Sequence, residues 1–247
     1  MFQSIGEMTT LLGQTLLALP LLWRHRDKVA EQFFEIGNAS LFLVCLIAFF
    51  LGGVLSLQTG PILAERGMAG VIGSVIGNSM VKEIAPVMIS MLLAGRVGSA
   101  MAAELGSMRV YQEIDALRTM NINPVRYLVL PRLTAIVLAL PMLVVVAILA
   151  GWFGGALVAS TNPRVGLSFP GYFASLRDGL NTWDVANGLI KSVVFAVVIG
   201  LASCHQGLAT VGGPRGIGRA VTQAVVISLS MILILDYFLT RLLMYFD

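Results

Sequence analysis

The stretch of sequence that decides the fold is residues 84–132, which read IAPVMISMLLAGRVGSAMAAELGSMRVYQEIDALRTMNINPVRYLVLPR. It begins as an apolar run, becomes polar and charged from Glu104 to Arg118, and meets another apolar run after Arg132. A helix of about 20 apolar residues is long enough to cross the hydrocarbon core of a bilayer. The pattern therefore predicts two membrane spans joined by a short polar helix outside the membrane.

The composition of the whole chain indicates that lipid surrounds most of it. Of its 247 residues, 57% are hydrophobic and only 12% are charged, and the mean hydropathy is +0.88. Soluble domains carry about 25% charged residues, so this chain has too few to cover a globular surface. We expect an all-α integral membrane protein with a single domain over residues 1–247. The net charge of +3 is small and the basic residues are scattered, which disfavours nucleic acid as a partner.

Five apolar runs are long enough to be transmembrane helices. They cover residues 37–57, 81–103, 133–159, 185–206 and 220–245. Between them, residues 58–80 read as a glycine-rich link that dips into the membrane surface, and residues 160–184 as an external loop. With the N-terminus in the cytosol, ten of the 16 lysines and arginines lie on the inner side. We therefore expect a cytosolic N-terminus and a periplasmic C-terminus.

The first 30 residues are predicted to form an amphipathic helix that lies in the membrane interface. Residues 8–23 are too short for a span and mix polar residues with leucines, and a basic cluster follows at 24–28. A frayed first span is the alternative. The basic cluster follows the apolar stretch, which is the reverse of the charge order in a cleavable signal peptide.

Motifs for catalysis are absent from the sequence. No Gly-x-x-x-x-Gly-Lys-Ser/Thr loop occurs, so we do not expect the chain to hydrolyse nucleotide. The glycine-rich segment 210–219 resembles a dinucleotide-binding turn, but it joins two membrane helices and lacks the acidic residue that would hold a ribose. A tight cytosolic turn is the better interpretation. His25 and His205 are far apart in sequence and lack ligand-like neighbours, so we expect neither a metal site nor a cofactor in this chain.

Charged residues at membrane depth are the candidates for function. Lys82 and Glu83 stand at the outer end of the second span, and Lys191 lies about two turns into the fourth. A charge at the centre of a span costs about 2.5–3.5 kcal/mol, so each needs a partner or water. These residues either edge a wet or amphiphile-holding cavity, or pair with one another at the rim. Arg96 lies among small residues, and we expect it to serve helix packing.

Residues 104–122 are predicted to be a helix that docks on a cytosolic protein. At helical spacing, apolar residues share one face and charged residues occupy the others: Val110, Ile114, Leu117 and Met120 against Arg109, Glu113, Asp115 and Arg118. A helix of this kind, too short to span and tethered at both ends, suits docking into a groove. An interfacial helix without a partner is the alternative.

Several of these motifs together resemble the MlaE (YrbE) permease family of MCE-type ABC transporters. The matching segments are residues 82–87, 93–106, 113–117, Met120, 123–124, 130–132, 190–195 and 207–221. The resemblance covers nearly the whole chain from about residue 30, and its motifs are specific to that family.

The resemblance implies a non-catalytic permease subunit of a complex that moves phospholipid or a related lipid between the inner and outer membranes. It implies a second copy of this chain in the inner membrane, a cytosolic ABC ATPase that binds ATP, and MCE-domain lipid-binding subunits on the outer side. A small cytosolic accessory subunit is a further candidate partner. A secondary transporter and a non-transporting membrane scaffold remain the alternatives, although no internal repeat supports the first.

The resemblance also assigns residues to two sites. Residues 104–122 would include the coupling helix that enters the ATPase, with contacts from Arg109, Glu113, Asp115, Leu117, Arg118 and Met120. A lipid cavity would be lined by Leu55, Gln58 and Ile62, with Lys82, Glu83 and Lys191 near its rim. Lys82 stands where some members of the family have arginine, which keeps the charge but loses bidentate phosphate binding.

Overall fold

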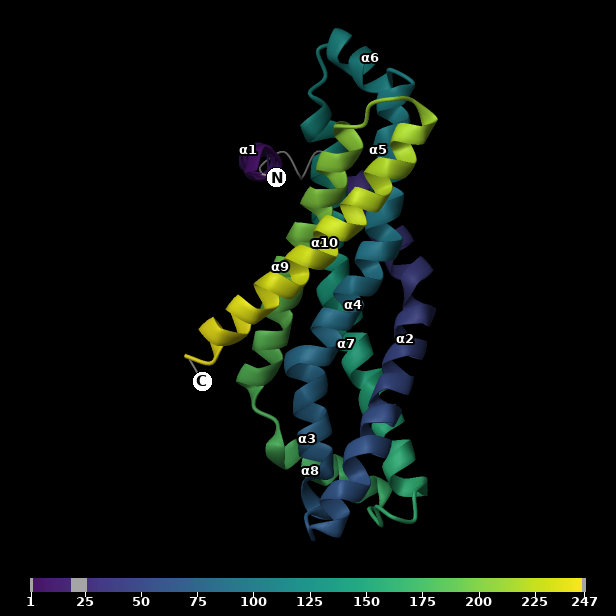
Figure 1. Cartoon of the computed structure of the whole chain (residues 1–247), viewed down its shortest axis with the longest axis vertical. Coiled ribbons are helices and arrows are strands. Elements are labelled where there is room, and N and C mark those ends of the chain that lie inside the picture. Colours follow the sequence, from purple (N-terminus) through teal and green to yellow (C-terminus); the bar gives the residue numbers. More distant parts are fainter. Residues whose placement is uncertain (1, 19–25, 246–247) are drawn as a thin grey trace. The chain divides into compact units, whose positions relative to one another are not determined.

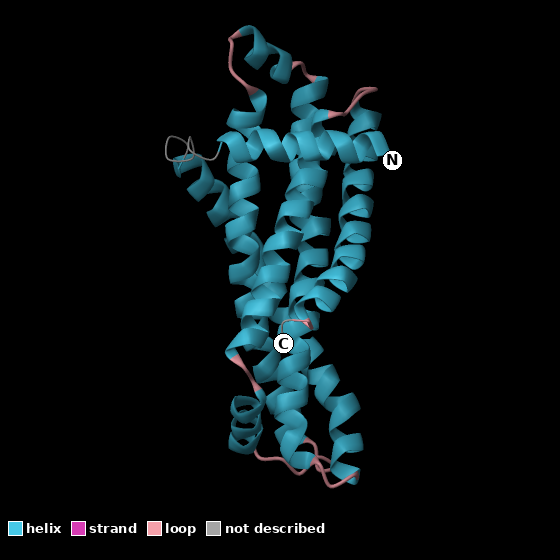
Figure 2. Ribbon diagram, turned by 90° about the vertical axis from the view of Figure 1, so that its left-hand side faces the viewer, coloured by secondary structure: helices cyan, strands magenta, loops and turns pink. Residues whose placement is uncertain are grey.

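The described part of the chain is helical, with no strand among residues 2–18 and 26–245 of this computed structural model. Figure 1 shows the helices, and Figure 2 shows the short loops that join them. The α-helices are α1 Phe2–Ala18, α2 Arg26–Glu65, α3 Ile72–Ser79, α4 Ala85–Leu93, α5 Ser99–Val110, α6 Glu113–Thr119, α7 Leu130–Thr161, α8 Phe169–Gly179, α9 Thr182–Leu208 and α10 Pro214–Leu243. A 3₁₀ turn covers Ala69–Val71, and π-helical turns cover Met80–Ile84, Ala94–Gly98 and Val125–Val129.

Five helical runs in the described residues are long and apolar enough to cross a membrane. They are Arg26–Glu65, Ala69–Val110, Val125–Thr161, Thr182–Leu208 and Pro214–Leu243. Each of the five predicted spans overlaps one of these runs, so the prediction of five spans is confirmed. The chain is a multi-pass helical membrane protein.

The chain divides into two compact units. Unit 1 comprises Met1–Ala39, Ser90–Leu140 and Val193–Leu239, and unit 2 comprises Ser40–Ile89, Pro141–Ser192 and Thr240–Asp247. Each unit therefore contains segments from both halves of the sequence.

Close contact between α2 and α7 organises unit 2. A Cβ added at Gly52 would overlap the backbone of Gly151, and one at Gly154 would overlap the backbone of Phe49. Residues without side chains let two helix backbones touch, which is the usual way membrane helices gain packing energy. Both helices continue through an internal proline, Pro61 in α2 and Pro141 in α7.

The two segments of unit 2 that were predicted to be a link and a loop contain helices that pack on each other. α2 continues to Glu65, and α3 follows it, while α8 occupies the middle of the segment 160–184. The backbone N–H of Ser74 donates to Ser175 at 3.2 Å, and Asn78 Nδ2 donates to the carbonyl of Gly179 at 2.9 Å. These contacts supply the backbone partners that an irregular segment would lack near a membrane.

In unit 1, α5 and the π-helical turn Ala94–Gly98 before it approach α9 through small residues. A Cβ added at Gly98 would lie 2.8 Å from Ser203 Oγ, and one at Gly207 would lie 2.6 Å from Leu105 Cβ. Arg96, predicted to serve packing, is instead exposed in this chain. It lies on the π-helical turn Ala94–Gly98, in which the buried Gly98 makes the close approach to α9.

The first helix, α1, lies across the other helices of unit 1 rather than along them (Figures 1 and 2). It has 17 residues and is separate from the five candidate spans. Glu7 Oε2 lies 3.6 Å from His205 Nε2 of α9. The frayed-span alternative therefore has no support in this arrangement, while the position of α1 in the interface stays a prediction.

Candidate functional site

A cavity of about 300 Å³ in unit 2 brings together the three charged residues predicted from the sequence. It lies where the π-helical turn Met80–Ile84, α9 and the end of α10 meet. Its lining residues are Asn78, Ser79, Lys82, Glu83, Asn187, Lys191, Thr240, Leu243 and Met244. These three charged residues line the cavity and also take part in ion pairs.

Lys191 is the most deeply buried charge of this group, with its side chain 3% exposed. Its ammonium group lies 2.7 Å from Glu83 Oε1 and donates to the Lys82 carbonyl at 3.1 Å and to Thr240 Oγ1 at 2.7 Å. Thr240 Oγ1 in turn donates to Glu83 Oε1 at 3.0 Å. An ammonium group has three hydrogens to donate, and each has an acceptor here. This arrangement offsets the cost of burying the charge.

The local sequence explains why the Lys82 carbonyl is available to Lys191. In a regular α-helix that carbonyl would accept the backbone N–H of residue 86, but Pro86 has none. Met80–Ile84 forms a π-helical turn, in which the Ala85 N–H reaches the Met80 carbonyl. Such turns shift the hydrogen-bond pattern and are frequent at functional sites.

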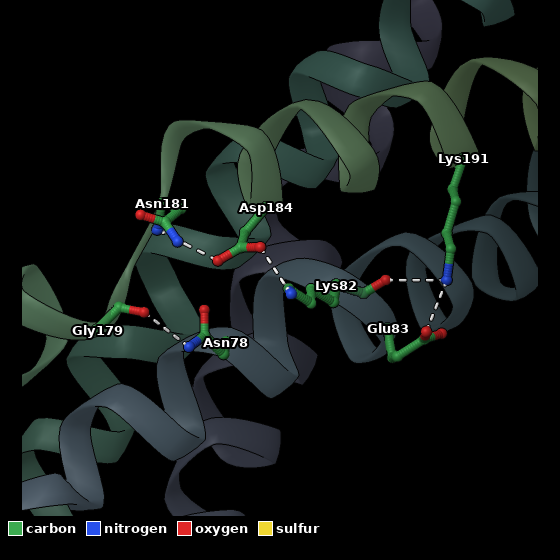
Figure 3. Close-up of polar contacts among 7 residues, drawn as sticks. All are labelled: Asn78, Lys82, Glu83, Gly179, Asn181, Asp184 and Lys191. Atoms are coloured by element: carbon green, nitrogen blue, oxygen red, sulfur yellow. Dashed lines mark hydrogen bonds and ion pairs between the residues drawn. The ribbon is translucent and has the colours of Figure 1, made fainter. Parts of the chain in front are cut away.

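A second ion pair neutralises Lys82. Its ammonium group lies 2.7 Å from Asp184 Oδ1, and the side chains are 37% and 4% exposed respectively. Asp184 also accepts the backbone N–H of Asn181 at 3.2 Å, at the beginning of α9 (Figure 3). A carboxylate is stabilised near a helix N-terminus, which helps to fix Asp184 in this position.

Sequence reasoning missed Asp184, Thr240, Asn78 and Asn187 as members of this site. The position of Asp184 in the first turn of a span was the one signal that could have identified it. Thr240 and the two asparagines carry no such signal, because their role depends on which helices meet.

Three residues that the family resemblance placed in the same cavity are elsewhere in unit 2. Leu55, Gln58 and Ile62 lie on α2, where Gln58 and Ile62 are exposed and Leu55 is half-buried. None of them is among the described residues that line the cavity. Their contact with lipid stays a prediction.

The segment predicted to be one helix over residues 104–122 is divided between α5 and α6. Tyr111 and Gln112 separate the two helices, and Gln112 has a left-handed backbone with φ of 62°. The single continuous helix is therefore corrected to two helices with a turn between them. A sharp turn of this kind requires a residue at positive φ, which a helical hydrophobic pattern does not reveal.

The apolar face of α6 packs inside unit 1, whereas the prediction directed it toward a partner. Ile114 is 1% exposed and joins a core cluster with Leu105, Val129 and Cys204. Leu117 is partly buried against the same cluster. Other side chains therefore face outward at this end of unit 1, including Tyr111, which is 70% exposed, and Met120, which is 61% exposed.

Ion pairs hold the turn and the adjoining helices. Asp115 Oδ1 accepts from Arg109 Nη1 at 2.7 Å and lies 3.7 Å from Arg118 Nη1. Arg132 of α7 contacts Glu104 of α5 at 3.0 Å and is 8% exposed. Glu113 is exposed. The predicted coupling residues thus separate into those that brace α6 and those that face outward.

Within residues 2–18 and 26–245, no group of three or more histidine, cysteine, aspartate or glutamate side chains is arranged to hold a metal ion. The arrangement is that of a multi-pass membrane protein with a cavity of charged and apolar lining residues in one unit and a braced polar turn in the other. The family described as Permease MlaE matches residues 29–242. The chain belongs to the MlaE permease family, which confirms the resemblance read from the sequence.

Relatives from several organisms match nearly the whole chain, and two of the three described here have permease names. A probable ABC transporter permease protein of Synechocystis is 37% identical over 98% of this chain and 91% of its own length. The intermembrane phospholipid transport system permease protein MlaE of Haemophilus influenzae is 31% identical over 98% of this chain and 92% of its own length. The chloroplastic protein TRIGALACTOSYLDIACYLGLYCEROL 1 of Arabidopsis thaliana is 35% identical over 92% of this chain and 65% of its own length.

Proposed function

We propose that this chain is the membrane-spanning subunit of an ABC complex that moves phospholipid or a related lipid between an inner and an outer membrane. The observation that carries the proposal is the cavity in unit 2, where two ion pairs line a space beside membrane-spanning helices. Charges at membrane depth are costly and are retained mainly where they serve a pathway or a ligand. The phospholipid transport named for the Haemophilus relative supports a lipid as that ligand.

The lining of the cavity suits an amphiphile. The π-helical turn Met80–Ile84 and α9 contribute charged and polar groups, and Leu243 at the end of α10 and the following Met244 add apolar surface. Ligand sites generally combine apolar walls with a few positioned polar groups. A headgroup would contact the ion pairs, while the acyl chains would follow apolar helix surfaces toward the membrane.

Movement of the lipid would be driven by ATP that a separate cytosolic ATPase binds and hydrolyses. The end of unit 1 that carries α6 is the contact surface for that ATPase, with Tyr111, Glu113 and Met120 facing outward. The bridge from Asp115 to Arg109 and Arg118 and the burial of Ile114 make α6 move together with α5. A cytosolic α6 also implies a cytosolic N-terminus, with α1 lying in the membrane interface.

The complex would contain further subunits in the inner membrane and beyond it. A second copy of this chain would pair with the first, and MCE-domain subunits on the outer side would pass the lipid onward. Exposed apolar residues on α10, including Leu233, Tyr237 and Phe238, give a surface that lipid or the second copy can cover. A small cytosolic accessory subunit is a further member that the family resemblance suggests.

Purification and reconstitution test this function. An untagged ATPase encoded with this chain should co-purify with the tagged chain, and proteoliposomes containing the complex should transfer labelled phospholipid only with ATP. Transfer without the ATPase would instead indicate a secondary transporter, and no transfer with an intact complex would indicate a scaffold. Glu113→Lys should abolish ATP-dependent transfer while the variant folds normally, and the matched change Glu65→Lys, an exposed acid at the end of α2, should not.

A further inference from the structure

A pocket of about 410 Å³ in unit 1 is lined by positive and hydrogen-bonding side chains. Arg109 lies on α5 and Arg118 on α6, while Gln14 comes from α1, and Asn121 and Asn123 follow α6. No aspartate or glutamate is among the described residues that line this pocket. Arginine and amide side chains all carry N–H donors, so the pocket is suited to an anion.

A neighbouring aspartate neutralises only part of this positive charge. Asp115 Oδ1 accepts from Arg109 Nη1 at 2.7 Å and lies 3.7 Å from Arg118 Nη1, which is too far for a hydrogen bond. Within residues 2–18 and 26–245, neither arginine has a further ion pair. Two guanidinium groups beside one carboxylate therefore leave one positive charge in excess. The Arg118 side chain is 63% exposed and can turn toward a ligand.

The turn after α6 fixes a further donor in the pocket. Asn123 Oδ1 accepts the backbone N–H of Val125 at 2.9 Å, across Pro124. This bond holds the side chain of Asn123 in place and uses its oxygen. The amide nitrogen, which can only donate, is then the group that a ligand in the pocket can bind.

A smaller pocket of about 100 Å³ continues the first one along α1. The two pockets share Gln14, Asn123 and Val125, and the smaller one adds Leu17 and Arg126. Leu17 is 82% exposed, so unit 1 does not cover this apolar side chain. An amphipathic helix in a membrane interface places such side chains among acyl chains. The positive, donor-rich pocket therefore leads to an apolar surface on the helix that is predicted to lie in the interface.

We propose that these two pockets bind an anionic phospholipid from the membrane leaflet in which α1 lies. Its phosphate would bind Arg109, Arg118 and the amide nitrogen of Asn123, while its acyl chains would pass Leu17 into the bilayer. This lipid would stay bound and hold α1 against the segment that carries α6. The proposal rests on the interface position of α1 proposed above, but it does not depend on lipid transfer through the cavity in unit 2.

Three compounds separate the contribution of charge from that of the acyl chains. Dioctanoyl phosphatidylglycerol is anionic, dioctanoyl phosphatidylcholine has zero net charge, and glycerophosphoglycerol is the anionic headgroup without acyl chains. Native mass spectrometry of the full-length chain in a neutral detergent measures the affinity of each. Phosphatidylglycerol should bind about tenfold more tightly than phosphatidylcholine, because the excess positive charge favours a net negative ligand. Glycerophosphoglycerol should bind more weakly than phosphatidylglycerol, because it buries no acyl chain.

One isosteric change and its matched control place the lipid in this pocket. Asn123→Asp keeps an oxygen to accept the Val125 N–H but adds a negative charge, so the preference for phosphatidylglycerol should fall about tenfold. Asn162 also precedes a proline, Pro163, and accepts the N–H of Arg164 at 3.1 Å, but it lies in unit 2. Asn162→Asp should therefore leave all three affinities unchanged.

A second pair of variants tests the guanidinium groups. Arg118→Gln removes the excess positive charge and should reduce the affinity for phosphatidylglycerol about fivefold, with little change for phosphatidylcholine. Arg215→Gln removes an exposed arginine of α10 in the same unit that does not line either pocket, so it should have no effect.

Each other result overturns a stated part of the proposal. Equal affinity for the two lipids overturns the preference for negative charge, and headgroup binding as tight as lipid binding assigns the pocket to a soluble phosphate compound. A preference that persists in both folded Asn123→Asp and folded Arg118→Gln overturns its location in unit 1. Equal lipid affinities together with loss of ATPase co-purification in Arg118→Gln would assign the pocket to the ATPase. ATP-dependent transfer is not measured here, so failure of this proposal is distinct from failure of the proposed function.

Discussion

Removal of one partner from the Lys191–Glu83 pair should have different effects depending on which partner is removed. Glu83→Leu leaves the ammonium group of Lys191, 3% exposed, without its countercharge. Breaking a buried pair costs about 3–5 kcal/mol, and we expect about 3 kcal/mol because the Lys82 carbonyl and Thr240 still accept hydrogen bonds. Lys191→Met leaves a carboxylate that is 40% exposed, so water can solvate it and the expected loss is about 1 kcal/mol.

The measurement is the free energy of unfolding of the full chain in mixed micelles, obtained by reversible denaturant titration. The double variant Glu83→Leu/Lys191→Met replaces both charges by apolar groups. It should recover about 2 kcal/mol relative to Glu83→Leu, because no buried charge remains unpaired. Arg177→Met, which removes an exposed cation in the same unit, is the control and should change stability by less than about 0.5 kcal/mol.

Equal losses in the two single variants would refute this reasoning, because they would mean that the burial of Lys191 does not govern the cost. A double variant as unstable as Glu83→Leu would also refute it. That result would show that packing, and not an unpaired charge, accounts for the loss.

Three further predictions follow from contacts in the two units. Gly154→Val should destabilise unit 2 by about 3 kcal/mol or more, because a Cβ at this position would overlap the backbone of Phe49. The control Gly95→Ala adds a Cβ that meets nothing within 4 Å, so it should be neutral or slightly stabilising. Thermal unfolding of both variants checks this prediction. Tyr172→Phe should leave stability unchanged or raise it by about 1 kcal/mol, because the buried Tyr172 hydroxyl has no hydrogen-bond partner among the described residues, and a clear loss in denaturant titration would contradict this. Ile114→Asp should unfold the end of unit 1 that carries α6, while Met120→Asp should fold normally and lose ATP-dependent lipid transfer. Size-exclusion profiles and the transfer assay distinguish these two outcomes. Normal lipid transfer by Met120→Asp would argue against an ATPase contact at Met120.

The candidate site was only partly predictable from the sequence. Three charged residues could be identified from the sequence, because charges in apolar spans are rare and energetically costly and are usually functional: Lys82, Glu83 and Lys191. Their pairing was not predictable, since Lys191 bonds to a carbonyl 109 residues away and to Thr240, 49 residues away in the other direction. Leu55, Gln58 and Ile62 were placed with them by resemblance and do not line the same cavity in this chain.

The region around α6 was likewise only partly predictable from the sequence. Helical periodicity identified Ile114 and Leu117 as one apolar face, but periodicity does not tell whether that face packs on the chain itself or on a partner. The structure buries Ile114 against Leu105 and leaves Tyr111 and Met120 outside. The left-handed residue Gln112, which divides the predicted helix, also escaped the pattern because polar residues at turns and on exposed helix faces look alike.

The sequence by itself determined the number of spans, the all-α class and the family, because apolar length and local motifs depend only on neighbouring residues. The tertiary structure alone decided which charges are neutralised and which face of α6 is outside. The physical reason is that burial and ion pairing depend on distances between helices, and residues far apart in the chain set those distances. Residues 84–132 illustrate both contributions. Their sequence pattern predicted two spans joined by a polar segment, but packing in unit 1 determined which side chains of that segment are exposed.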